Sequence, residues 1–185
     1  MFFFFLFVFI NMITIKDGEA VLSDYMLALP SFKKLYQSDK DKKKTYFHAC
    51  LLYIYFMYDF SSPYFDYPET KRHEQVKEYV LPNTEIKTDD PVLLECIAVY
   101  KSFKPIEIQL LEDGLTACYN LGEYIRSVDY KETDDNGKRK HNPKEIADIV
   151  NNLGKTITSI KQLRAKAKEG LNDATKVEKE LFEDE

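Results

Sequence analysis

The stretch Thr45–Tyr58 reads TYFHACLLYIYFMY and is the most apolar part of the chain after its first ten residues. Its apolar side chains follow neither a 3.6-residue nor a 2.0-residue period. A helix that is apolar on every side belongs at the centre of a fold. Tyr, Phe and Ile also favour strands, but the stretch is long for a strand, so we predict a buried central helix.

Shorter helices are predicted on both sides of this centre, each with a recognisable start or stop signal. Ser23 or Asp24 can cap a short helix that Pro30 interrupts, and a turn or two of helix follows at 32–36. Pro68 suits the first position of a mostly polar helix, and Asp90 followed by Pro91 is a cap-and-proline start for another. The predicted helices downstream of the centre therefore span 68–81, 91–103 and 106–128.

The helix predicted at 106–128 is amphipathic, because its apolar residues recur at three- and four-residue spacings. That stripe consists of Ile108, Leu111, Leu115, Cys118 and Ile125. At the other end of the chain, Ile13 and Ile15 alternate with polar residues before an Asp17-Gly18 turn signal, which predicts a short β-hairpin at 12–22.

A heptad pattern begins after Pro143 and continues for about four heptads, which indicates a coiled coil or a long docking helix. Its apolar positions are Ile146, Val150, Leu153, Ile157, Ile160, Ala167, Leu171 and Ala174. Such a seam can pack on the body of the same chain or on another chain. The fold class predicted is mainly α: an irregular helical bundle with a short N-terminal β-hairpin and a long C-terminal coiled-coil-like helix.

We divide the chain into a segment 1–11, a helical body 12–128, a polar loop 129–142 and a C-terminal docking helix 143–185. The first segment reads MFFFFLFVFIN, and three interpretations stay open. It docks on a partner as an apolar strand or helix, it anchors at a membrane interface without the usual polar face, or it is a leader upstream of a start at Met12. We favour the third. Its apolar run is too short to cross a membrane, which takes ~20 residues.

Composition limits the function classes. The formal net charge of −5 argues against non-specific nucleic-acid binding by the whole molecule. Cys50, Cys96 and Cys118 are odd in number and widely spaced in apolar stretches, so we expect buried thiols in place of a disulfide framework or a zinc site. We predict no cofactor and no metal.

The sequence contains no recognisable catalytic grouping. His48 and Cys50 are two residues apart, so a helix points them in different directions. Glu69 and His73 can make an ordinary contact four residues apart, and His141 lies in a basic turn. Motifs for nucleotide binding, for serine hydrolases and for zinc proteases are missing from the sequence. We therefore predict that the protein is not an enzyme.

Aromatic side chains are concentrated between Tyr46 and Tyr67, more densely than a small core can easily bury. Tyrosine is favoured at protein interfaces, because its ring is apolar while its hydroxyl can stay hydrogen-bonded. We predict that Tyr64, Phe65 and Tyr67 contact another protein, together with Ile146, Val150, Leu153, Ile157, Ile160 and Leu171 of the C-terminal helix. The alternative is that the aromatic loop folds back and caps its own core.

The stretch Ile54–Val76, IYFMYDFSSPYFDYPETKRHEQV, resembles segments in small structural proteins of large tailed phages, especially the crAss-like phages that infect gut Bacteroidetes. The shared feature is Y-D-x-x-S-P-Y followed by a proline-led, charged helix. The resemblance implies a virion protein that is assembled in the host cytoplasm and contacts capsid, portal or neck proteins, with self-association as a further interaction. The other interpretation of the chain is a soluble helical adaptor that binds a single regulatory partner.

Overall fold

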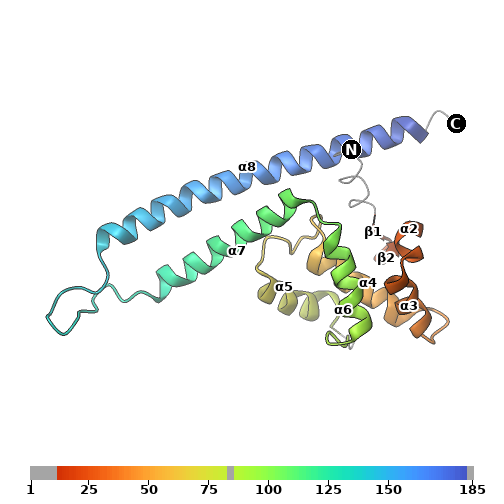
Figure 1. Cartoon of the computed structure of the whole chain (residues 1–185), viewed down its shortest axis with the longest axis horizontal. Helices are drawn as coiled ribbons and strands as arrows, with labels where there is room; N and C mark the ends of the chain where they lie inside the picture. Colours follow the sequence, from red (N-terminus) through yellow and green to blue (C-terminus); the bar gives the residue numbers. More distant parts are fainter. Residues whose placement is uncertain (1–11, 83–85, 183–185) are drawn as a thin grey trace.

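The computed structural model describes residues 12–82 and 86–182, with side chains as far as Lys166. The chain is mainly α, with 65% of it helical and a short antiparallel hairpin near the N-terminus, which confirms the predicted fold class. A helical body occupies one end of the molecule, and two long helices extend from it (Figure 1). The predicted segment 1–11 lies outside the described residues.

The hairpin consists of β1 (Ile13–Lys16) and β2 (Glu19–Leu22), as the sequence predicts. Asp17 and Gly18 both have positive φ angles, 54° and 83°, which is the backbone that a tight two-residue hairpin turn requires. A lone hairpin is marginal in water, but Ile13 and Ala20 of this one are buried against the helical body.

At the centre lies α4 (Thr45–Tyr58), and its buried side chains point to several sides of the helix, as predicted. It packs against both strands of the hairpin and against α6 (Pro91–Ser102). The helix α3 (Pro30–Ser38) packs on α6, and α2 (Asp24–Ala28) packs on α3. The start of α4 is capped from a distance, because the Asp39 carboxylate accepts the Phe47 backbone N–H at 2.9 Å. That hydrogen bond holds the pKa of Asp39 below its usual value.

The polar helix predicted at 68–81 is interrupted. It forms α5 (Glu69–Gln75) and then widens into a π-helical turn, η1 (Val76–Val80), where the Leu81 N–H donates to the Val76 carbonyl at 3.1 Å. Val76 is fully buried at the point where the helix widens. The prediction of one regular helix was wrong in its last turn.

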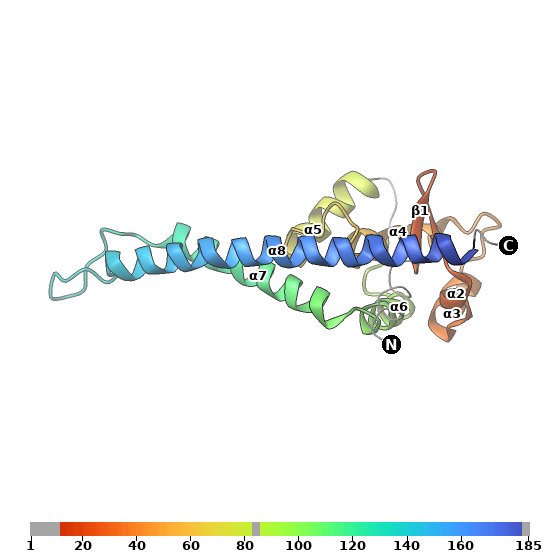
Figure 2. The same ribbon diagram turned by 90° about the horizontal axis from the view of Figure 1, so that it is seen from above.

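Beyond α6 the chain forms a helical hairpin, defined here as α7 (Ile106–Ser127) and α8 (Pro143–Phe182) with the loop 128–142 between them. The two helices run antiparallel and lie side by side in both views (Figures 1 and 2). At 1.5 Å per residue, α7 is about 33 Å long and α8 about 60 Å. The long helix therefore passes beyond the start of α7 and over the body (Figure 2).

Candidate protein-binding surfaces

The aromatic loop, residues 59–68, connects α4 to α5. Asp59 ends α4, and its carboxylate accepts the Ser61 N–H at 2.7 Å and the Tyr100 hydroxyl from α6. Inside the loop, the Ser62 hydroxyl donates to the Phe56 carbonyl at 2.7 Å. Aspartate and serine side chains of this kind stabilise turns because they satisfy backbone groups that no helix or strand pairs.

Arg72 of α5 holds the aromatic loop in place through hydrogen bonds to its backbone. Its side chain is buried, and its guanidinium donates to the carbonyls of Phe65 at 2.8 Å and Tyr67 at 2.9 Å, and also to that of Met57. A carboxylate oxygen of Glu112 on α7 lies 3.2 Å away and balances the charge. One arginine thus joins α4, the aromatic loop, α5 and α7.

The three aromatic residues predicted to contact a partner lie in different places. Phe65 is fully buried, with its ring 5.1 Å from that of Phe60 and the Arg72 guanidinium 5.3 Å from it. Tyr64 is half-buried against Phe56, while Tyr67 is 48% exposed. At Phe65 the loop caps its own core, so an exposed contact does not fit this residue. Of these three residues, Tyr67 and, in part, Tyr64 are open to another protein.

A second group of buried polar side chains lies where α4, α6 and α7 meet. Burial raises the pKa of Asp59, and the hydrogen bond from Tyr100 opposes that shift. Burial lowers the pKa of Lys104, which pairs with Glu112 at 2.5 Å. Each group has a partner inside the protein, and the ion pairs of Glu112 with Lys104 and Arg72 join α7 to the body.

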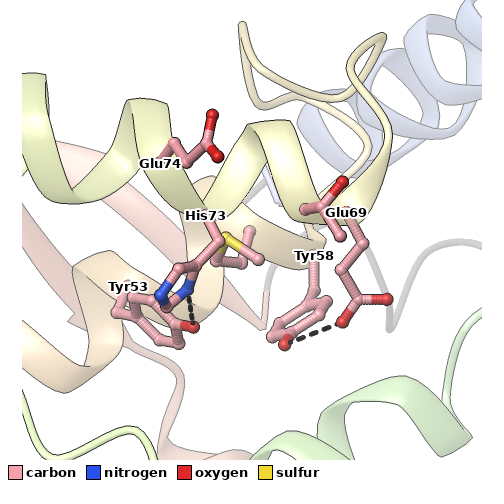
Figure 3. Close-up of a pocket in the computed structure, with 7 residues that line it drawn as sticks. Tyr53, Tyr58, Glu69, His73 and Glu74 are labelled. Carbon is pink, nitrogen blue, oxygen red and sulfur yellow. Dashed lines mark hydrogen bonds between the residues drawn. The ribbon is translucent and has the colours of Figure 1, made fainter.

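A shallow groove opens between α4 and α5, with a volume of about 500 Å³ (Figure 3). Its lining residues are Tyr53, Met57, Tyr58, Glu69, Thr70, His73 and Glu74. His73 and Glu69, expected to contact each other, instead face tyrosines of α4: His73 Nδ1 lies 2.8 Å from the Tyr53 hydroxyl, and the Tyr58 hydroxyl donates to Glu69 at 3.2 Å.

Burial changes the pKa values of the groups that line the groove. Burial raises the pKa of Tyr53 to about 12 and raises that of Tyr58 as well, so both phenols stay protonated near neutral pH. Burial lowers the pKa of His73. Lys101 of α6 already occupies the end of the groove, 3.3 Å from Glu69 and 4.2 Å above the Tyr58 ring. These polar groups of the groove are therefore hydrogen-bonded or ion-paired with one another or with Lys101.

The predicted seam of α8 divides into covered and uncovered positions. Ile146 and Ile160 are buried and Leu153 is half-buried, whereas Val150 is 48% and Ile157 39% exposed. The side chain of Leu171, also predicted at a contact, lies outside those the structure describes.

The two helices of the hairpin approach closely at Gly114. An atom at the Cβ position of Gly114 would lie 3.2 Å from Ile160 Cδ1, so a glycine there allows the contact. Farther along α8, Arg164 forms an ion pair with Asp66 of the aromatic loop. The C-terminal helix therefore packs on its own chain, through α7 and through the loop.

The α7 helix carries a second apolar stripe, which we call the outer stripe: Ile106, Leu110, Leu121 and Tyr124. In chain order these residues are four, eleven and three positions apart, so they lie along one side of the helix. They are between 36% and 59% exposed, while Ile108 and Leu111 of the predicted stripe are buried. The outer stripe was not predicted from the sequence, although helical spacings of four, eleven and three residues place its members on one side of α7.

Comparisons with known proteins give no match from which a function could be inferred. No protein-family model, no curated protein and no solved structure matches this chain. Within residues 12–82 and 86–182, no helix combines the length and apolar character needed to cross a bilayer.

Proposed function

We propose that this chain is a non-enzymatic structural protein that binds other proteins through its α7–α8 hairpin. The observation that carries the proposal is the outer stripe. Exposed apolar residues are normal when scattered, but an aligned row of large ones is typical of an interaction site. Covering the exposed parts of these four side chains would contribute on the order of 1 kcal/mol each before the costs of association.

The shape of the hairpin supports the same function. Its distal half extends away from the body, so a partner can reach it from more than one side (Figure 1). The partly exposed Val150 and Ile157 lie on this distal part of α8 and add apolar area to it. A rigid pair of helices also presents such residues at fixed spacings, which reduces the entropy lost on binding.

For the setting, we propose the virion of a tailed phage, with capsid, portal or neck proteins as the neighbours. The support is the resemblance of Ile54–Val76 to small phage structural proteins. In this setting Tyr67 provides a second, smaller contact beside the hairpin, because it is the most exposed aromatic side chain of that loop.

The test is incorporation into particles. A chain with Leu110→Ser and Leu121→Ser should co-sediment with gradient-purified particles at least about tenfold less than the wild-type chain, since two ~1 kcal/mol losses together exceed the ~1.4 kcal/mol of a tenfold change. The control is Leu94→Ser with Tyr79→Ser, which removes two exposed side chains from α6 and η1. Quantitative mass spectrometry of the particle fraction gives the ratio.

Equal incorporation of the outer-stripe variant and the control would refute binding through the hairpin. Absence of the wild-type chain from particles would refute the virion setting. If that chain instead captured one soluble protein and lost it with Leu110→Ser and Leu121→Ser, the adaptor interpretation would replace it.

A further inference from the structure

The two helices of the hairpin carry opposite charge. Acidic side chains outnumber basic ones on α7, where Arg126 stands against Glu107, Glu112, Asp113 and Glu123. The reverse holds on α8 between Pro143 and Lys166, where Glu145 and Asp148 stand against Lys144, Lys155, Lys161, Arg164 and Lys166. Glu112 pairs with Arg72 and Lys104, and Glu123 pairs with Arg126, so Glu107 and Asp113 are the acidic side chains that can attract a partner. A partner that offers apolar residues beside basic ones therefore suits the outer stripe of α7.

The helix α8 has such a surface left over after it packs on α7. Val150, Ile157 and Leu163 are each more than a third exposed. Val150 and Ile157 are seven residues apart and lie on one side of α8, and the exposed Lys161 lies on the same side, four residues after Ile157. Packing on α7 leaves these residues partly exposed.

The uncovered residues of the two helices also occur at matching heights along the hairpin. Starting from the contact of Gly114 with Ile160, antiparallel helices with equal rise place Tyr124 level with Val150. By the same count, Leu121 is level with Leu153. The distal end of the outer stripe is thus level with the part of α8 that carries Val150.

We propose that the partner of the outer stripe is a second copy of this chain, with α7 of one copy packed on α8 of the other. The inference rests on the proposed function and names its partner. A two-fold symmetric pair makes this contact twice, α7 on α8 and α8 on α7, and produces a four-helix bundle. Pairing of α7 with α7 would oppose acidic side chains, whereas pairing of α7 with α8 opposes unlike charges.

The test uses two charge-reversed versions of the full chain. One carries Asp113→Lys, three residues after Leu110 on α7, and the other carries Lys161→Glu, four residues after Ile157 on α8. Both positions are exposed, so the helices should be kept, as circular dichroism can verify. Sedimentation velocity over a concentration series measures self-association.

The wild-type chain should form a dimer, and each variant should dissociate at least about tenfold more readily, because both of its interchain contacts then oppose like charges. An equimolar mixture of the two variants should recover the dimer, since each contact again joins unlike charges. Two misfolded variants could not restore each other, so the mixture separates charge pairing from damage to the fold.

A wild-type chain that stays monomeric at all concentrations would overturn the inference, as would variants that dimerise as well as wild type or fail to recover when mixed. Failure of the proposed function would look different. A monomer that still enters particles through Leu110 and Leu121 refutes only the second copy as partner. A dimer whose outer-stripe variant enters particles normally refutes only the docking of the hairpin on the virion.

Discussion

Replacement of Arg72 by Met is expected to lower the free energy of unfolding by about 3–5 kcal/mol, the usual cost of removing one partner from a buried charged pair. The change would leave the carbonyls of Phe65 and Tyr67 without their donor and Glu112 without one of its two cations. Urea unfolding followed by circular dichroism measures the loss. Limited proteolysis should also cut the aromatic loop sooner.

The matched control for Arg72→Met is Lys71→Met, one residue earlier in α5. Lys71 is exposed and pairs with Glu74 on the surface, so its loss should leave the free energy of unfolding close to that of the wild-type chain. If Arg72→Met unfolded at the same urea concentration as this control, Arg72 would not hold the loop in the way its contacts indicate.

Truncation of Phe65 to Ala should cost about 3–5 kcal/mol of stability, because it opens a cavity in the core. Tyr67→Ala, two residues away, should cost less than about 1 kcal/mol, since nearly half of Tyr67 is exposed. Thermal unfolding of the two variants side by side gives the comparison.

The two positions should also separate in binding. Tyr67→Ala is expected to weaken incorporation into particles while it leaves the fold intact. Equal and small losses of stability at Phe65 and Tyr67 would show that the loop does not cap the core.

The sequence predicted most helices well because their start signals are local. Asp90 caps α6 through the Val92 N–H at 2.8 Å, and Pro91 follows it, as the dipeptide indicated. The turn at Asp17 and Gly18 depends on two adjacent residues. Such features need no information from distant parts of the chain.

The positions of the aromatic residues could not be read in this way. Phe65 and Tyr67 are both aromatic and two residues apart, but only Phe65 turns inward, against the Phe60 ring and the guanidinium of Arg72, which pairs with Glu112. Glu112 follows Arg72 by 40 positions, so the pattern around the loop does not contain this contact. The partners of His73 and Glu69 are likewise on another helix, α4.

The neighbours of α8 were only partly predictable, for a related reason. A heptad pattern shows which side of a helix is apolar, but not which neighbour covers it. In the structure α7 covers Ile146 and Ile160 and leaves Val150 and Ile157 partly exposed. The outer stripe of α7, whose four residues are all exposed, is therefore the better candidate for a contact with another chain.

In the assembled protein, we propose, another chain covers the outer stripe. Hydroxyl-radical footprinting, read by mass spectrometry, measures this directly at Tyr124, with Tyr79 as an exposed reference on another element. Relative to Tyr79, modification of Tyr124 should fall several-fold between the dilute isolated chain and the assembled protein at native abundance. Equal modification of Tyr124 in the two states would contradict the claim.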